Sequence, residues 1–413
     1  MAAEAEWMEV GTGTPESGCE VRPAAVRRVV EGLSAFLERY RRLFGRSENG
    51  EHAERYVRGR LRDTGRRTTE PIARQEKVPR RALQQFVGAG PWDDPRVRRQ
   101  MRQEIAAELG DPDGALIVDG SAVRKFGPHS VGTARQYCNN LGKIENRQVG
   151  EYLAYATAKG TAPVDAELCL PRSWARDRAR RAAAGVPRKV RFREGWRIAL
   201  ALLDASRADL PHRWILGDDQ YGKVVLFRDG LAARGEPYLL DVPSDRRIVR
   251  ANGEKTRLDR LAAALPAEAF QRVRTRDGAK GPIEVEAYRE VVTPIRDERR
   301  QGPSRREVLL ILRHADGTFS YHFSNAEHVR TASLAKAAAM RHSMEEILET
   351  AKQDAGMAEY EMRSWLGWHH PITLSMLSTW FLVQQHRRSK RGLLPSPSPW
   401  FASPQLASSP PAS

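Results

Sequence analysis

Apolar side chains recur at intervals of three and four residues through the first quarter of the chain. Val29, Leu33 and Leu37 follow this spacing, which places them on one face of an amphipathic helix. We therefore expect residues 23–110 to form a helical domain, and residues 1–22, which show no such pattern, to form a loosely ordered lead.

From Ala115 onward, short apolar runs alternate with helical patterns. ALIV at 115–118 and WILG at 214–217 read as buried strands, because short apolar runs are typical of strands covered on both faces. Strands that alternate with helices predict an α/β sheet, with residues 111–245 as the first part of its core. The other expected elements are two strands around a turn at Lys159-Gly160 within 147–171, a strand at 237–245, and helices at 196–209 and 223–235.

The alternation stops between residues 246 and 330. Segments at 283–295, 307–317 and 318–324 are strand-like. The Asp316-Gly317 pair predicts a hairpin turn between the last two. This stretch therefore reads as a mainly β insertion within the α/β domain.

Two helical patterns follow the insertion, at 333–356 and 372–385. Residues 331–386 are expected to complete the core. The remaining tail, 387–413, is rich in Pro and Ser and has too few apolar residues to pack, so we expect it to be disordered.

The composition limits the partners of the chain. Its 413 residues are 40% hydrophobic, and 68 Lys and Arg against 52 Asp and Glu give a formal charge of +16. An excess of this size favours a polyanion, either nucleic acid or an anionic membrane surface. No run of about 18 apolar residues is present to span a bilayer, so we expect a nucleic-acid partner and no membrane association.

The ends and the cysteines indicate a compartment. The first ten residues, MAAEAEWMEV, lack the basic and apolar regions of a secretory signal. Cys19, Cys138 and Cys169 are widely spaced and form no CxxC pair, which argues against a disulfide framework and a zinc knuckle. These features fit a reducing, cytoplasmic setting, and the Arg and Ala bias points to a bacterial source, where the protein would join the nucleoid when bound to DNA.

Two segments concentrate positive charge. Residues 52–110 hold 14 Lys and Arg against 8 Asp and Glu, so the helical domain is a candidate DNA-binding module; a solvated basic face is an equal alternative. Residues 172–197 hold 10 Lys and Arg, 2 acids and three aromatic rings, as nucleic-acid tracks do; core-packed rings on a solvated helix are the alternative. The rings are Trp174, Phe192 and Trp196, and the candidate DNA contacts are Arg180, Arg181, Arg188 and Lys189, with Arg135 from a polar cluster at 129–137.

Two aspartates follow apolar strands. Asp119 comes directly after ALIV, and Asp218 after WILG. Carboxyl ends of strands are where ligands bind in an open α/β sheet, so the two side chains converge if their strands are neighbours. Converging carboxylates repel each other unless a cation neutralises them, and oxygen ligands suit Mg²⁺ or Mn²⁺. The alternative is that each aspartate caps the turn or helix that follows it.

A third carboxylate lies on the helix after the insertion. Arg341, Glu345, Leu348 and Lys352 fall at i, i+4, i+7 and i+11, which places them on one helical face. This places one carboxylate between two cations on the same stripe of the helix. The alternative is a surface helix stabilised by an i, i+4 ion pair.

A cluster of rings near the C-terminus raises the question of a further metal site. Trp365, Trp368, His369 and His370 are close in sequence. Two adjacent histidines point to different faces of a helix, so core packing or phosphate contact is favoured over a shared metal.

Several segments in order resemble one family. They are RALQQFVGAGPWD, ALIVDGSAV, HSVGTARQYCNNLGKIENRQVG, LPRSWARDRARRAAAGVP, WILGDDQYG and YEMRSWLGWHH. Together, from about residue 80 to about residue 382, the chain resembles bacterial insertion-sequence transposases of the DDE class. That resemblance implies an RNase H-like catalytic core, interrupted by the β insertion and preceded by the helical DNA-binding region.

The resemblance also assigns the site. It implies that Asp119, Asp218 and Glu345 are the catalytic carboxylates and hold two Mg²⁺ ions, with Mn²⁺ able to substitute. Arg341 and Lys352 match the basic positions of the Tyr-x2-Arg-x3-Glu-x6-Lys signature and would bind phosphates; its Tyr position is Ala338 here, and Gly120-Ser121 stands where relatives often carry an acidic residue and Thr. The intervals of 99 residues between the aspartates and 127 to the glutamate leave room for the insertion.

The implied function is a DDE transposase. It would bind the terminal inverted repeats of an insertion sequence as double-stranded DNA, catalyse Mg-dependent strand cleavage and strand transfer, and act as a homodimer on DNA. One alternative is a domesticated DNA-binding protein without cleavage activity, although all three carboxylates are kept. A glycoside hydrolase also uses paired carboxylates, but the strong positive charge argues against it.

Overall fold

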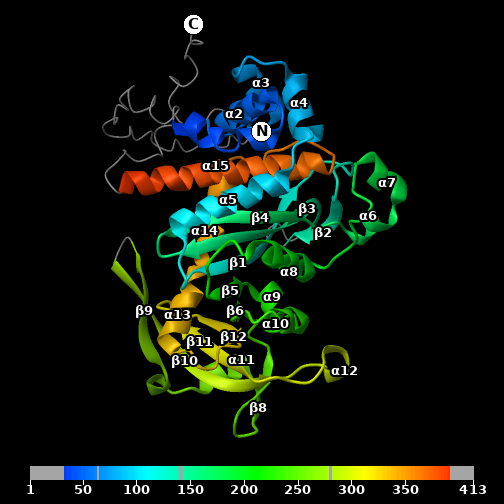
Figure 1. The fold of residues 1–413 in the computed structure, drawn as a ribbon. Helices are drawn as coiled ribbons and strands as arrows, with labels where there is room; N and C mark the ends of the chain where they lie inside the picture. Colours follow the sequence, from blue (N-terminus) through cyan, green and yellow to red (C-terminus); the bar gives the residue numbers. More distant parts are fainter. Residues whose placement is uncertain (1–31, 63–64, 139–142, 279–280, 391–413) are drawn as a thin grey trace, which may run out of the picture.

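The computed structural model describes residues 32–62, 65–138, 143–278 and 281–390. The expected lead at 1–22 and the tail beyond residue 390 lie outside the described residues. The predicted α/β class is confirmed, because one large mixed sheet is flanked by helices (Figure 1).

Three parallel strands form the middle of the sheet. They are β1 (Ala115–Arg124), β5 (Trp214–Gly217) and β6 (Tyr238–Asp241). Val118 pairs with Gly217, and Gly217 with Leu240. Their apolar residues are almost fully buried, as expected for parallel strands covered on both faces.

Antiparallel strands flank β1 on one side. The long strand β3 (Lys143–Thr157) pairs with β1 and, on its other side, with β4 (Gly160–Leu168) and β2 (Ala134–Cys138). The predicted turn at Lys159-Gly160 connects β3 and β4, where Gly160 has a φ of 144°.

The predicted β insertion, residues 246–330, continues the same sheet, and we call it the β extension. Strand β12 (Phe319–Ser324) pairs with β6 and with β11 (Glu307–Arg313) through the predicted Asp316-Gly317 hairpin. The path then passes through β10 (Gly281–Pro294), which also pairs with β9 (Gln271–Gly278), to β7 (Arg247–Val249) and β8 (Lys255–Arg257). A small second core forms where α11 (Leu258–Ala264) packs on this part. The insertion is thus joined to the core through the backbone of β6.

The helices before β1 and the last helix pack together. η1 (Arg41–Phe44), α2 (Ser47–Arg60), α3 (Thr69–Gln75), α4 (Arg80–Ala89) and α5 (Asp94–Leu109) precede the sheet. Helix α15 (Leu366–Lys390) contacts α2, α4, α5 and β4, and Figure 1 shows it running between the N-terminal helices and the sheet. None of the described helices has the length and apolar character needed to cross a bilayer.

The remaining helices connect or cover the strands. They are α6 (Arg172–Arg176), α7 (Arg178–Ala183), α8 (Gly195–Ser206), α9 (Asp219–Gly222), α10 (Val225–Ala232), η3 (Ala267–Ala269), α12 (Glu298–Gln301), α13 (Thr331–Met340) and α14 (His342–Gln353).

Two predicted helix boundaries were wrong. The single helix expected at 333–356 is broken at Arg341 into α13 and α14. Helix α15 begins before residue 372 and runs through Lys390, so the first residues of the expected tail are helical. Arg387 on that extension lies 3.5 Å from a carboxylate oxygen of Glu108 on α5, and this contact adds to the packing that the tail composition did not reveal.

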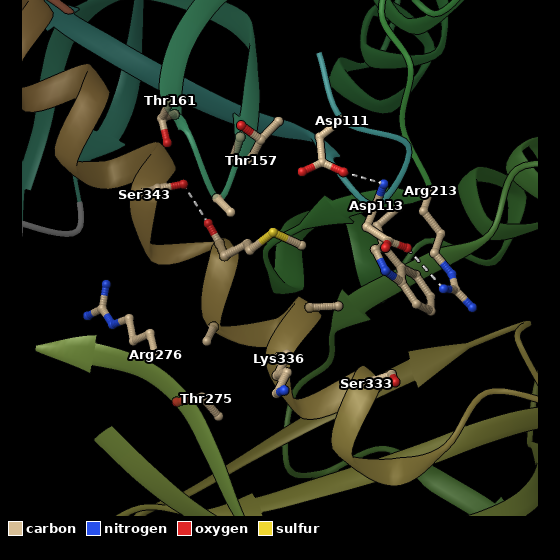
Figure 2. Close-up of a pocket in the computed structure, with 16 residues that line it drawn as sticks. Asp111, Asp113, Thr157, Thr161, Arg213, Thr275, Arg276, Ser333, Lys336 and Ser343 are labelled. Atoms are coloured by element: carbon tan, nitrogen blue, oxygen red, sulfur yellow. Dashed lines mark hydrogen bonds and ion pairs between the residues drawn. The ribbon is translucent and has the colours of Figure 1, made fainter. Parts of the chain in front are cut away.

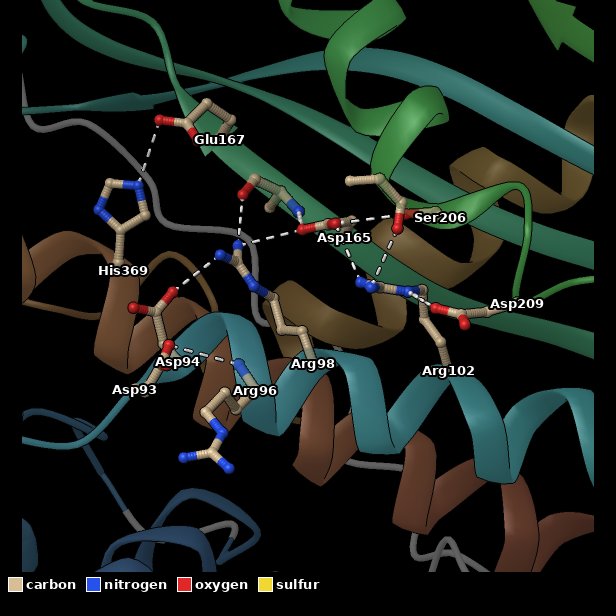
Figure 3. Close-up of polar contacts among 12 residues, drawn as sticks. Asp93, Asp94, Arg96, Arg98, Arg102, Asp165, Glu167, Ser206, Asp209 and His369 are labelled. Carbon is tan, nitrogen blue, oxygen red and sulfur yellow. Dashed lines mark hydrogen bonds and ion pairs between the residues drawn. The ribbon is translucent and has the colours of Figure 1, made fainter. Parts of the chain in front are cut away.

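A buried ion network ties α5 to the sheet (Figure 3). Arg98 Nη1 and Arg102 Nη1 lie 3.2 and 3.1 Å from the two carboxylate oxygens of Asp165 on β4. Arg102 also pairs with Asp209 at 3.0 Å, and Arg98 with Asp94 at 2.8 Å. Because these side chains are almost fully buried, each charge depends on its partner.

We expect Asp165→Asn to destabilise the fold by about 3–5 kcal/mol, because it leaves two buried guanidinium groups facing a neutral amide. Chemical denaturation measures the change. The exposed Glu70, which pairs with Arg74 and Arg80, is the control: Glu70→Gln should cost less than about 1 kcal/mol. Equal effects of the two substitutions would show that the network does not hold α5 in place.

Candidate active site

Asp119 and Asp218 lie side by side on neighbouring parallel strands. Each follows directly after the last pair of the β1–β5 ladder, Val118 with Gly217. Asp119 is not at a strand end as expected, because β1 continues to Arg124 along its antiparallel partner β3. The parallel partner β5 stops at Gly217, so β1 has no β5 partner from Asp119 onward.

Asp218 also caps a helix. Its carboxylate accepts a hydrogen bond from the Gln220 backbone N–H at 3.0 Å, at the start of α9. The capping alternative is therefore correct for this residue, and it still leaves Asp218 electrostatically coupled to Asp119. Asp219 is the first residue of α9 and also acts on Asp218 through its charge.

Burial is the main cause that raises the pKa of both aspartates. Burial, and next the charge of Asp218, raise the pKa of Asp119 to about 7. Burial raises the pKa of Asp218 to about 6, against the lowering effect of the Gln220 hydrogen bond, and the Asp219 charge adds to the rise. Arg341 lowers the pKa of both. The positive charge of Arg341 is thus not enough to bring either pKa back to its usual value.

Arg341 is the cation that faces this pair. It stands between α13 and α14, and its Nη2 lies 3.2 Å from Glu345 Oε1. Its Nε lies 2.7 Å from Asp241 Oδ2. Asp241, Glu345, Asp218 and Asp119 all favour its charged form.

Glu345 does not meet the two aspartates as a ligand. Its side chain is 53% exposed and pairs with Arg341 and, at 3.5 Å, with His342 Nδ1. Within the described ranges, no three His, Cys, Asp or Glu side chains lie close enough together to hold a metal ion. The structure thus gathers Asp119, Asp218 and Arg341, and Glu345 pairs with the Nη2 atom of Arg341.

The sequence reasoning missed Asp241. This residue ends β6, the third parallel strand, next to Asp218 in register. Burial favours its neutral form, but His322 and Arg341 outweigh burial and lower the pKa of Asp241. The signal was present, because PYLLD ends an apolar strand on an aspartate just as ALIVD does.

A fourth buried carboxyl group, Glu151, lies near Asp119. Glu151 pairs with Gly120 across the β1–β3 ladder and accepts hydrogen bonds from the Tyr221 hydroxyl and the Cys169 thiol. A Cβ atom on Gly120 would lie 3.5 Å from Glu151 Oε2. Burial raises the pKa of Glu151, against these hydrogen bonds. Gly120 itself carries no carboxyl group, but the carboxyl group of Glu151 on β3 lies beside this position.

The candidate DNA contacts differ in availability. Arg181 donates to the backbone carbonyls of Ala175, Pro187 and Val190, which ties its guanidinium to the local fold. Arg180 donates to Pro128 O and lies 3.8 Å from the Trp174 ring centroid. The others are Arg135, Arg188 and Lys189, which are exposed, and Lys352, which is half-buried at the end of α14.

The candidate stacking rings and the paired histidines are mostly core residues. Trp174 is buried and donates to Thr133 O at 2.8 Å, so its ring is closed to bases. His370 is fully buried and stacks on Trp92 with 3.8 Å between ring centroids. His369 is buried and lies 3.4 Å from Glu167. The two histidines thus contact different residues, Trp92 and Glu167.

A cavity of about 650 Å³ opens at the other ends of the same strands (Figure 2). Asp111, Asp113 and Arg213 form one wall, and residues of α13 and β9, including Lys336, form another. None of the three candidate carboxylates lines it. The candidate carboxylates therefore lie apart from this cavity.

The arrangement is compatible with a divalent cation. Two adjacent carboxylates supply hard oxygen donors, and their pKa values stay raised although Arg341 lowers both. Such a cluster favours a bound cation because a cation removes the repulsion between the carboxylates.

Comparisons with known proteins give related results. The family model described as DDE superfamily endonuclease matches residues 39–282. The chain is 26% identical over 153 residues to a probable transposase for insertion sequence element IS701 from Microchaete diplosiphon, covering 37% of this chain and 40% of that protein. The chain thus matches less than half the length of this relative. A cryo-EM structure of a piggyBac transposase synaptic complex with hairpin DNA aligns over 92% of this chain and 76% of that one, at 11% identity and a TM-score of 0.41.

We expect Asp119→Asn to stabilise the metal-free protein at pH 8 by at least about 1 kcal/mol and to leave it nearly unchanged at pH 4. The folded protein holds the Asp119 proton up to about pH 7, while the unfolded chain releases it near pH 4, so wild-type stability is lost as pH rises across this window.

Denaturation curves in a chelating buffer at several pH values test this expectation. Asp113→Asn is the control, because the Asp113 side chain is 77% exposed. A difference between Asp119→Asn and wild type that does not change from pH 4 to pH 8 would contradict it.

Proposed function

Because the chain belongs to the DDE superfamily endonucleases, we propose that it is an insertion-sequence transposase that cleaves and joins DNA with Asp119, Asp218 and Glu345. The resemblance carried by its sequence motifs is confirmed by the family match and the IS701 relative. The single observation that carries the proposal is the pairing of Asp119 with Asp218 at the parallel sheet edge, beside Arg341.

The strand arrangement supports an RNase H-like core. The order β4-β3-β1-β5-β6, with β1, β5 and β6 parallel and β3 antiparallel to them, is the order we expect for that fold. The α13–α14 segment that carries Glu345 then follows the β extension. The proposed domain limits are 23–110, 111–245 and 246–330, as expected from the sequence, and 331–390, because α15 runs through Lys390.

Asp119 and Asp218 are proposed to hold two divalent cations together with Glu345. When bound, Mg²⁺ or Mn²⁺ supplies activation of a water or a DNA 3′-hydroxyl and stabilises the leaving oxygen. Glu345 would have to exchange its contact with Arg341 for this role. Asp218 keeps the better position of the two adjacent aspartates, because its carboxylate is coupled to Asp119 and fixed by the Gln220 amide.

Arg341 is proposed to bind a phosphate near the scissile bond. Its planar guanidinium presents several donors in a fixed geometry, which suits phosphate oxygens. Lys352 lies near the end of α14, on the same helical face as Glu345, and would contact the DNA backbone as a point charge. No covalent protein–DNA intermediate is required.

The substrate proposed is double-stranded DNA at element ends and at the target. The formal charge of +16 and the basic 172–197 segment support an electrostatic footprint, and the N-terminal helices are proposed to contribute to it. Two element ends must be held together, so we propose a homodimer on DNA, acting in the bacterial cytoplasm at the nucleoid.

A domesticated DNA-binding protein without cleavage is the second candidate, and the exposed position of Glu345 is the observation that favours it. The DNA around the gene separates the two. Terminal inverted repeats bounded by short direct duplications support a mobile element, and their absence supports domestication.

We expect Asp119→Asn, Asp218→Asn and Glu345→Gln each to lower Mg²⁺- or Mn²⁺-dependent cleavage of end-bearing DNA by about 10³-fold or more, because each removes a proposed cation ligand. Gel assays of labelled DNA measure the rate. Asp219→Asn is the matched neighbour control and should lower the rate much less. Cleavage at wild-type rates by the variants of Asp119, Asp218 and Glu345 would contradict the catalytic assignment.

We expect the double substitution Arg188→Ala with Lys189→Ala to weaken DNA binding on all sequences alike. It should also reduce the slope of log affinity against log salt by about two, roughly one for each lost phosphate contact. Fluorescence anisotropy over a salt series provides both values. Arg272→Ala, at a side chain 81% exposed on β9, is the control outside the proposed footprint, and an equal slope change there would rule out a specific track.

A further inference from the structure

The Arg341 guanidinium pairs with an aspartate on β6, which in turn contacts a histidine on β12. Its Nε forms an ion pair with Asp241 Oδ2 at 2.7 Å, and Asp241 Oδ1 lies 2.8 Å from His322 Nδ1. Asp241 ends β6, and His322 is its direct partner on β12. The contacts from Arg341 through Asp241 to His322 therefore connect the proposed active site to the β extension.

The chain of contacts continues along β12. His322 Nε2 and His314 Nε2 both lie 3.0 Å from Ser320 Oγ. One set of protons satisfies every hydrogen bond: His314 donates to Ser320, Ser320 to His322, and His322 to Asp241, whose other oxygen forms the ion pair with Arg341. His322 is only 4% exposed, so these partners, and not water, fix its ring.

Arg341 needs such an anchor. It stands at the break between two helices and faces Asp119, Asp218 and Glu345, any of which attracts a guanidinium. A long flexible side chain among several carboxylates has no single preferred position. A carboxylate bound at Nε fixes the plane of the group and leaves its Nη side toward the cluster.

We propose that Asp241, backed by His322, is a positioning residue that holds Arg341 for its phosphate contact. This inference rests on the proposed strand cleavage. It gives the β extension a role in the reaction, because β12 supplies the group that orients Asp241. Asp241 itself touches neither DNA nor the reacting atoms in this assignment.

Charge and position predict opposite effects on two measurements. Asp241→Asn removes a negative charge near DNA, so binding in a chelating buffer should be equal or tighter. A displaced guanidinium should nevertheless lower kcat for cleavage by roughly 10- to 100-fold, the range for a misplaced active-site group. A purely electrostatic role for Asp241 would change binding and leave kcat intact.

The test is a double-mutant cycle of Asp241→Asn with Arg341→Gln, with kcat and metal-free DNA affinity measured by gel assay and anisotropy. We expect Asp241→Asn to cause no further loss in kcat once Arg341 is replaced, because it acts only through that side chain. Independent, multiplicative losses would overturn the proposal. His322→Gln should show a smaller kcat loss that also vanishes on the Arg341→Gln background, and it tests the same link if Asp241→Asn fails to fold.

Asp229→Asn is the matched control. Asp229 is 27% exposed and pairs with Arg296 at 3.0 Å, compared with 23% for Asp241. An equal kcat loss there would overturn positioning. Failure of the cleavage assignment itself is distinguishable, because it would leave Asp119→Asn and Asp218→Asn active.

Discussion

Repulsion between two carboxylates at one sheet edge is the constraint on which the site depends. Parallel pairing of β1 with β5 places Asp119 beside Asp218, and burial deprives both of water. Arg341 offsets part of this cost in the described protein, and a divalent cation would offset more. The raised pKa values express this deficit, because each carboxylate is most stable near its partner when one of them keeps a proton.

The rest of the fold keeps that edge in place. Helix α15 is buried on almost all sides between the N-terminal helices and the sheet, and its hydroxyl side chains at Ser378 and Thr379 donate to carbonyls of its own backbone. The buried Arg60 donates to Ser375 and Tyr56, linking α2 to this helix. With the Arg98–Asp165–Arg102 network, these contacts join the N-terminal helices firmly to the sheet, so any DNA bound by the helices is held relative to the carboxylates.

The β extension is joined to the same edge. Because β12 pairs with β6, the sheet carries His322 directly to Asp241. The guanidinium of Arg341 thus contacts Asp241 of β6, which pairs with His322 of the β extension, and Glu345 of α14. Segments far apart in the sequence thereby act on one side chain.

The sequence by itself determined most of the local structure and the composition of the site. Short apolar runs located β1, β5 and β6, the Asp316-Gly317 pair located a hairpin, and the motifs identified the family. The broken helix at Arg341 was not predicted, because the periodicity of apolar residues continues across it. Asp241 was passed over although its strand ending matched the pattern used for Asp119.

Only the tertiary structure decided which of these groups meet. It placed Asp119 inside a strand, since pairing with β3 extends β1, and it used Arg181 and Trp174 for local contacts that their basic and aromatic character did not reveal. It also turned Glu345 toward Arg341. The physical reason is that local sequence fixes periodicity and charge, while strand register and burial fix distances between side chains that are far apart in the sequence.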